Sequence, residues 1–160
     1  MVGDFDGDGK SDVGVYDPPS GTWYLTRSKL GFLQTKFGYA GTIPVVGDFD
    51  GDGKDDIGCY YPPGGNWYVM QSTAGFMQTQ FGYTGTIPIV GDFDGDGKDD
   101  IGCYYPPGGN WYVMQSTTGF WTAQFGYAGS RAVLGMFYKV SVDYVRRESI
   151  DELPRESIVI

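Results

Sequence analysis

Aspartates are concentrated in three short segments whose spacing could bind metal ions. The segment Gly-Asp-Phe-Asp-Gly-Asp-Gly-Lys begins at Gly3, Gly47 and Gly91, and a further aspartate follows two residues after each lysine. The four aspartates take positions 1, 3, 5 and 9 of a loop whose sixth residue is glycine. Carboxylates this close repel one another unless a cation lies among them, and glycine permits the sharp turn. The pattern predicts three cation sites.

Each predicted site uses oxygen ligands only, which favours calcium, about three ions per chain. The ligands are four aspartate side chains and the backbone carbonyl of the lysine at position 7. They are Asp4, Asp6, Asp8, Lys10 and Asp12 in the first loop, Asp48, Asp50, Asp52, Lys54 and Asp56 in the second, and Asp92, Asp94, Asp96, Lys98 and Asp100 in the third. An EF-hand needs glutamate at position 12, where Val15, Cys59 and Cys103 stand. The remaining alternative is a solvated hairpin turn without an ion.

The composition excludes several classes of function. The chain has 160 residues, no histidine and a formal charge of −9, which three bound dications would reduce to −3. Without histidine, Ser-His-Asp and Cys-His chemistry and the usual zinc sites are absent, and we expect no enzyme. The acidity argues against nucleic acid or anionic lipid as a partner. Cys59 and Cys103 stand where the first repeat has Val15, which predicts buried free thiols.

The acidic segments belong to a 44-residue repeat, since residues 46–73 and 90–117 are identical. In the second repeat, strands are predicted at 44–49, 56–61, 67–72 and 76–81, separated by turns rich in Gly, Pro and Asn. The fold class is therefore all-β, and a period in the forties favours four-stranded β-propeller blades. In an up-and-down blade the loops after strands one and three lie at one end. The opposite end carries the Pro-Pro-Gly-Gly-Asn turns.

We divide the chain into blades at 2–45, 46–89 and 90–130, followed by a divergent tail at 131–160. In the tail, residues 132–137 and 139–145 resemble a first and a second strand, and 146–160 fit either a short helix or a strand. About three and a half blades are too few for a ring of roughly 4–8. The prediction is a homodimer that closes one ring, and the alternative is a fragment of a longer propeller.

These motifs carry a resemblance to a known family. Val-Gly-Asp-Phe-Asp-Gly-Asp-Gly-Lys-x-Asp, followed by a Pro-Pro turn, Trp-Tyr and Phe-Gly-Tyr, resembles the FG-GAP/VCBS-type repeats of integrin α-chain propellers and of bacterial extracellular proteins over residues 2–129. The resemblance implies structural calcium in the hairpin that joins the first two strands of a blade, and ligand recognition on the other face. Some fungal lectins look similar and hold sugars between blades.

Aromatic residues on the predicted opposite face are candidate ligand contacts. They are Trp23, Trp67 and Trp111 after the turn, and Tyr39, Tyr83 and Tyr127 in the Phe-Gly-Tyr segments. An indole can stack on a sugar ring, but repetition of the residue in every unit favours packing between blades. We expect an extracellular or periplasmic, calcium-stabilised, non-enzymatic module for recognition or adhesion, with a glycan or a cell-surface protein as ligand. A purely architectural, self-assembling module is the alternative, and a calcium-dependent hydrolase or lyase is less favoured.

Overall fold

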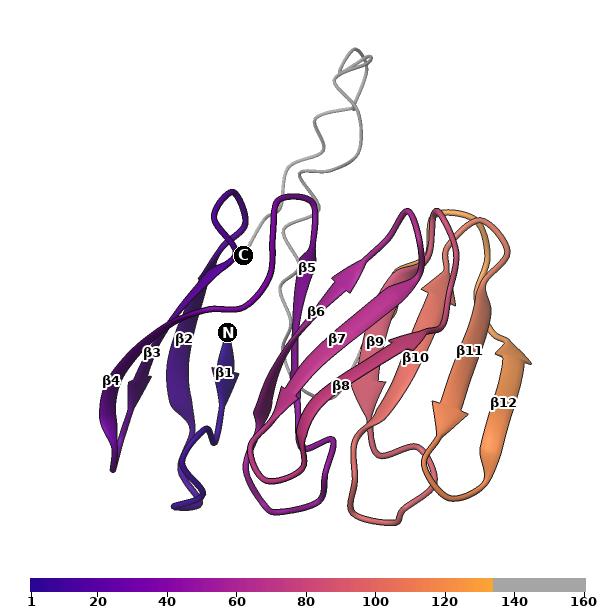
Figure 1. The fold of residues 1–160 in the computed structure, drawn as a ribbon. Coiled ribbons are helices and arrows are strands. Elements are labelled where there is room, and N and C mark those ends of the chain that lie inside the picture. Colours follow the sequence, from indigo (N-terminus) through magenta and orange to yellow (C-terminus); the bar gives the residue numbers. More distant parts are fainter. Residues whose placement is uncertain (134–160) are drawn as a thin grey trace, which may run out of the picture.

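The computed structural model describes residues 1–133, which form three four-stranded antiparallel sheets side by side (Figure 1). The first sheet contains β1 (Val2–Gly3), β2 (Asp12–Asp17), β3 (Thr22–Arg27) and β4 (Gly31–Lys36). The second contains β5 (Ile43–Gly47), β6 (Asp56–Tyr61), β7 (Asn66–Gln71) and β8 (Gly75–Gln80), and the third contains β9 (Ile87–Gly91), β10 (Asp100–Tyr105), β11 (Asn110–Gln115) and β12 (Gly119–Gln124). The predicted all-β class is confirmed. Residues 1–133 include no helix and thus none long and apolar enough to cross a membrane, and their sheets do not close into a ring.

Strands follow one another in chain order within every sheet, as an up-and-down arrangement requires. The predicted strand 56–61 coincides with β6, and the other three predicted strands of that repeat are shifted by one or two residues. β5 ends at Gly47 because Asp48 already belongs to the acidic loop. The predicted tail strands and the helix-or-strand segment lie outside the described residues, except for residues 131–133, which are in no strand.

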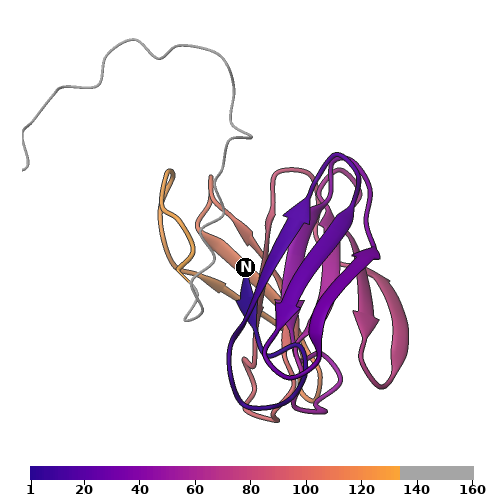
Figure 2. The ribbon, with the colours of Figure 1, turned by 90° about the vertical axis from the view of Figure 1, so that its left-hand side faces the viewer.

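Two apolar cores lie between neighbouring sheets. In the first, Phe5, Trp23 and Leu25 of the first repeat pack with Val46 and Ile57 of the second. The next core lies one repeat later and has similar residues, which are Phe49, Tyr60, Trp67 and Val69 with Ile101 and Cys103. The second sheet therefore buries one face against the first sheet and its other face against the third. Figure 2 views the row of sheets from the end of the first sheet.

The tryptophans are structural parts of these cores. Trp23 and Trp67 are 0 % exposed. Their indole N–H groups donate to the backbone carbonyls of Phe37 (2.8 Å) and Phe81 (2.9 Å). A side chain without accessible surface cannot stack on a ligand, so the interpretation of Trp23 and Trp67 as ligand contacts is wrong. Their repetition reflects packing between sheets.

The turns that carry these tryptophans are fixed by backbone contacts. Gly65 has φ +63°, and its carbonyl accepts from the N–H of Phe81 at 2.7 Å. A Cβ at Gly65 would lie 2.3 Å from the carbonyl oxygen of Gly82, so only glycine fits there. In the same region the Tyr60 hydroxyl lies 2.6 Å from Oγ1 of Thr86, which ties the second sheet to the segment leading to the third.

Both cysteines are buried and free, as predicted from their equivalence to Val15. Burial raises the pKa of the Cys59 thiol to about 11. The thiol therefore stays protonated at neutral pH and behaves as a small apolar side chain.

Candidate metal centre

The three acidic loops connect the first and second strands of their sheets and lie along one edge of the row (Figure 1). The turns between the third and fourth strands lie beside the acidic loops. In the first sheet, the backbone N–H groups of Lys29 and Leu30 both donate to Oδ2 of Asp6, at 2.8 and 2.9 Å. The prediction that the loops after strands one and three share one end is thus confirmed. Four strands and two loops build each candidate site.

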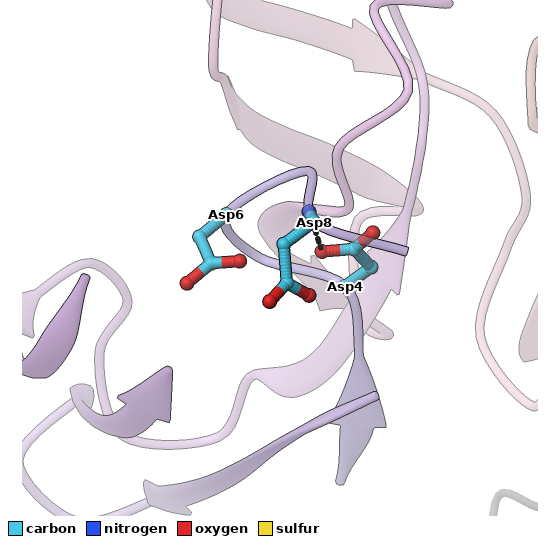
Figure 3. Close-up of side chains that lie close together, drawn as sticks. All are labelled: Asp4, Asp6 and Asp8. Atoms are coloured by element: carbon cyan, nitrogen blue, oxygen red, sulfur yellow. Dashed lines mark hydrogen bonds between the residues drawn. The ribbon is translucent and has the colours of Figure 1, made fainter. Parts of the chain in front are cut away.

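The first aspartate organises its own loop. Oδ1 of Asp4 accepts from the N–H groups of Gly7 (2.7 Å) and Asp8 (3.2 Å), and Oδ2 accepts from Gly9 at 2.8 Å. Figure 3 shows the hydrogen bond from Asp8. Desolvation acts to raise the pKa of Asp4, but these backbone donors outweigh it and hold the pKa below its ordinary value. The same three backbone hydrogen bonds recur at Asp48 and Asp92. Glycine at φ near +70° to +90° is what brings these N–H groups inward.

The second aspartate has one oxygen without a partner. Asp6 is only 4 % exposed. Its Oδ2 accepts two backbone hydrogen bonds, whereas its buried Oδ1 accepts none. The equivalent oxygens of Asp50 and Asp94 are also buried and unpaired. A buried carboxylate oxygen without a donor is costly, and the same unpaired oxygen in three loops fits a position beside a bound cation.

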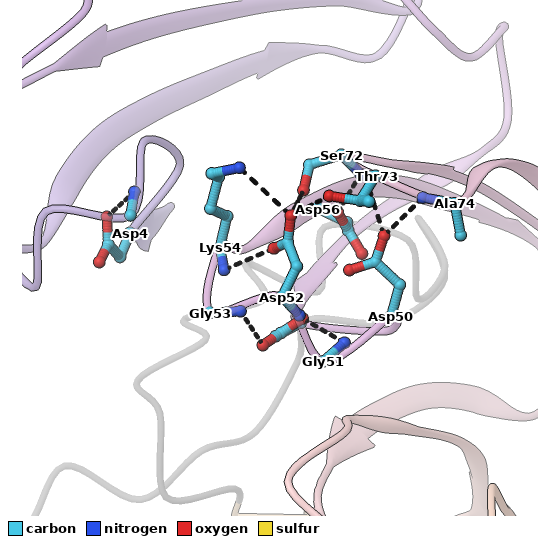
Figure 4. A network of polar contacts seen from close by, with 12 residues as sticks. Asp4, Asp50, Gly51, Asp52, Gly53, Lys54, Asp56, Ser72, Thr73 and Ala74 are labelled. Atoms are coloured by element: carbon cyan, nitrogen blue, oxygen red, sulfur yellow. Dashed lines mark hydrogen bonds and ion pairs between the residues drawn. The ribbon is translucent and has the colours of Figure 1, made fainter.

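The third aspartate is held by hydroxyl groups of the neighbouring turn. Oδ2 of Asp52 accepts from the hydroxyls of Ser72 (2.6 Å) and Thr73 and from Nζ of Lys54 at 3.2 Å (Figure 4). In the third loop, Ser116 and Thr117 bond Asp96 in the same way and lower its pKa to about 2. These carboxylates are therefore ionised throughout the physiological range.

The fourth aspartate is the most deeply buried. Asp56 is 2 % exposed; its two oxygens accept from the N–H groups of Ser72 (2.6 Å) and Phe49 (3.1 Å). Burial raises its pKa to about 7, and the nearby charge of Asp50 acts in the same direction. Asp12 and Asp100 bridge their loops and turns in the same manner.

Three of the predicted ligands converge in every loop. Ligand oxygens within 4.8 Å of one another are offered by Asp4, Asp6 and Asp8, by Asp48, Asp50 and Asp56, and by Asp92, Asp94 and Asp96. An all-oxygen donor set with an unpaired buried oxygen fits a hard cation such as calcium. The roles of the remaining aspartates and of the carbonyls of Lys10, Lys54 and Lys98 stay predictions.

The raised pKa values lead to a test of the calcium-free protein. A carboxyl whose pKa is raised by folding contributes stability below its unfolded pKa and loses it as the pH rises through the folded value. Asp56 (about 7) and Asp99 (about 6) are such groups. In chelator we expect the melting temperature to fall between about pH 4 and pH 7, by roughly 2–4 °C for each kcal/mol lost. With calcium, the part of the fall that comes from Asp56 should vanish, because the ion binds its ionised carboxylate. A melting temperature that rises over this range in chelator would contradict the assignment.

Sequence reasoning missed a contact that links each of the first two loops to the next sheet. Oδ2 of Asp55 accepts from the N–H of Asp4 at 2.6 Å, and the N–H of Asp55 donates to the carbonyl of Asp4 at 2.8 Å. Asp99 makes the same pair with Asp48, at 2.9 and 2.7 Å. We call each pair a latch. The only signal in the sequence was the double aspartate at 55–56 and 99–100, where the first repeat has Ser11.

The latch predicts a specific stability loss. Asp55→Ala leaves the N–H of Asp4 without its acceptor, and we expect a loss of about 1–3 kcal/mol in the free energy of unfolding by urea denaturation. Asp55→Asn retains a carbonyl oxygen and should cost less. Ser11→Ala, at the equivalent exposed position of the first repeat, is the control and should change the stability of the single chain, at low protein concentration, by less than about 0.5 kcal/mol. Equal losses for the Asp55→Ala and Ser11→Ala variants would show that the latch is not stabilising.

The predicted tyrosines lie at the end opposite the acidic loops and remain accessible. Tyr39 packs against Tyr61 and Tyr68 of the next sheet, with ring centroids 5.3 and 6.1 Å apart. Tyr83 repeats these contacts with Tyr105 and Tyr112, at 5.2 and 6.0 Å. Each cluster lies at a junction between sheets, whereas Tyr127, beyond the third sheet, is largely exposed. Trp111 is only partly buried, unlike its two counterparts.

Comparison with protein families indicates what the repeat is similar to. A family model for the FG-GAP-like repeat matches residues 4–59. The match is consistent with an FG-GAP-type repeat protein. Searches of curated proteins and of solved structures gave no match. The matched FG-GAP segment includes the acidic loops of the first two repeats, and the third loop has the same sequence as the second.

Proposed function

We propose that this FG-GAP-type chain is a non-enzymatic, calcium-stabilised β-propeller module that serves recognition or adhesion outside the cell or in the periplasm. The observation that carries the calcium assignment is the buried, unpaired carboxylate oxygen of Asp6, Asp50 and Asp94. A dication beside each of these oxygens would neutralise the converging carboxylates and join the two turns of one sheet. Millimolar calcium outside cells suits weak loops of this kind.

The ions would be structural. Asp6, Asp50 and Asp94 already bind the backbone of the turn between strands three and four, so an ion at their free oxygens would strengthen that connection. The lack of histidine in all 160 residues leaves the chain without the commonest general base, which supports a non-enzymatic role.

The ion count tests this proposal. We expect about three calcium ions per chain by equilibrium dialysis with elemental analysis. Asp50→Asn removes one charge without changing the side-chain size and should lower the count by one. Asp17→Asn, outside the loops, is the matched control and should leave the count unchanged. An empty wild-type chain at millimolar calcium would refute calcium binding, and an unchanged count for Asp50→Asn would refute the assigned site.

Recognition would use the tyrosine face. The clusters around Tyr39 and Tyr83 present accessible aromatic edges at the sheet junctions, where a sugar ring or an apolar side chain of a protein could pack. We expect binding on a glycan array or in a pull-down with a cell-surface protein, and loss of that binding in Tyr83→Ala. Normal binding by the Tyr83→Ala variant would exclude this surface.

A purely architectural module is the second candidate. It is favoured by the complete burial of Trp23 and Trp67, which assigns the most conspicuous aromatics to packing. Absence of any glycan or protein ligand, together with three bound calcium ions, would favour this function over recognition.

A further inference from the structure

The two ends of the row of sheets expose apolar faces that are buried at the internal junctions. On the first sheet, Val2, Val13 and Phe32 lie in one cross-strand row with Val15 two residues along β2, and we call this the leading face. On the third sheet, Phe93, Trp111, Trp121 and Phe125 form the trailing face. All eight residues are partly or largely exposed within the described part of the chain.

The leading face of each later sheet is covered by the sheet before it. Val15 is 60 % exposed, whereas its counterparts Cys59 and Cys103 are 1 % and 0 % exposed. Val46, the counterpart of Val2, is buried in the core with Phe5 and Trp23. The leading face of the first sheet thus has the shape and polarity of a surface that is buried twice elsewhere in the chain.

The trailing face is the other half of the same junction. Phe37 and Phe81 contact Phe76 and Phe120 of the following sheet edge-on, with ring centroids 6.2 Å apart in both pairs. Their counterpart Phe125 is 78 % exposed. Beside it lies a hollow of about 710 Å³, lined by Phe93, Trp111 and Trp121 among others. At the second junction the equivalent region is filled by Ile101 and Cys103.

We propose that the trailing face binds the leading face of a second copy of this chain, head to tail, in the arrangement of the two internal junctions. Val13 and Val15 of the second copy take the places that Ile101 and Cys103 occupy at the second junction, and Phe32 contacts Phe125. The internal junctions identify the occupant. At each of them a trailing face binds the leading face of the next sheet, and the leading face of the first sheet is the exposed surface that most resembles these buried leading faces.

The second copy also completes the third acidic loop. At the internal junctions, the latch residues Asp55 and Asp99 hold the backbone of Asp4 and Asp48. In the head-to-tail pair, Ser11 of the second copy stands at the latch position beside Asp92. Its hydroxyl can accept the same hydrogen bond, although it is shorter and uncharged. This junction is therefore weaker than the internal ones.

Charge favours this pairing. Five aspartates and one lysine give the second and third repeats a formal charge of −4 each, whereas five aspartates and four basic residues leave the first repeat at −1. The basic residues are Lys10, Arg27, Lys29 and Lys36. A third repeat meets less repulsion from a first repeat than from another copy of itself.

The two faces differ, so the contact is heterologous, and this gives a complementation test. In calcium buffer, we expect the 160-residue chain to have a solution mass above the 17.5 kDa of one chain, by sedimentation and light scattering over a wide range of concentration. Val15→Glu and Phe125→Glu should each raise the dissociation constant by more than about tenfold. Both side chains are exposed in the single chain, so the variants should fold, and circular dichroism checks this.

An equimolar mixture of the two variants retains one unmodified leading face and one unmodified trailing face. We expect it to form an open one-to-one pair with wild-type affinity at the remaining junction. Ala40→Glu adds the same charge in the loop between the first two sheets, where the second repeat has Thr84, and should change the dissociation constant by less than about twofold. A monomeric wild-type chain, a mixture that does not associate, or an equal effect of Ala40→Glu would each overturn the proposal.

Discussion

Removal of calcium is expected to lower the melting temperature by roughly 15–30 °C. An ion that binds only the folded state contributes about 2.7 kcal/mol at a hundred times its dissociation constant, and three independent sites contribute about 8 kcal/mol. For a chain of this size each kcal/mol corresponds to roughly 2–4 °C. The reason for so large an effect is the cluster of carboxylates at each site, which includes a buried and unpaired oxygen of Asp6, Asp50 or Asp94. Differential scanning calorimetry in chelator and in millimolar calcium measures the shift.

Two controls separate site binding from general screening of the charge of −9. Magnesium at the same concentration screens equally but demands a smaller octahedral shell, so we expect a much smaller shift. Asp50→Asn removes one site of three and should lose about a third of the calcium shift, whereas Asp17→Asn should keep all of it. Superimposable melting curves in chelator and calcium would contradict the calcium assignment.

The latches predict that calcium stabilises the junctions as well as the individual sheets. Asp4 orders its loop through three backbone donors, and its own N–H and carbonyl bind Asp55 of the next sheet. An ion that fixes the first loop therefore also fixes the groups that bind the second sheet. The loss in Asp55→Ala should accordingly be larger in calcium than in chelator.

Much of the fold follows from the sequence because the repeat is so regular. Turn residues and the 44-residue period placed β6 correctly and the other strands of that repeat within two residues. The acidic spacing also brought three carboxylates together in every loop. These features depend on local geometry, which glycine, proline and alternating apolar residues determine within a few positions.

Contacts between repeats were harder to predict. The latch of Asp55 spans 51 residues, and nothing in its local sequence distinguishes it from a solvated aspartate. The hydroxyls of Ser72 and Thr73 reach Asp52 only because the third turn folds beside the acidic loop. The residues next to Trp23 and Trp67 in the sequence do not tell whether these side chains stack on a ligand or pack in a core. Only the position of the next sheet decides between the two roles.

Truncation of a buried tryptophan is the second change with a large expected effect. Trp67→Ala removes a fully buried indole from the second core, together with its hydrogen bond to the carbonyl of Phe81. We expect a loss of about 3–5 kcal/mol in the free energy of unfolding, measured by urea denaturation in calcium. A ligand-binding tryptophan could be removed with little loss of stability, so a change below about 1 kcal/mol would contradict the packing role.

Trp111→Ala is the matched comparison, because Trp111 has the same neighbours in sequence and the same hydrogen bond, to the carbonyl of Phe125. Its indole is partly exposed, so at low protein concentration we expect a smaller loss than for Trp67→Ala. If a second copy covers the trailing face, the loss should grow with protein concentration, because the indole then becomes buried at the new junction. Trp67 already lies in a complete junction within one chain, so the loss of stability in Trp67→Ala should depend less on protein concentration. Comparison of the two denaturation series therefore distinguishes a tryptophan that packs within one chain from one that packs between two.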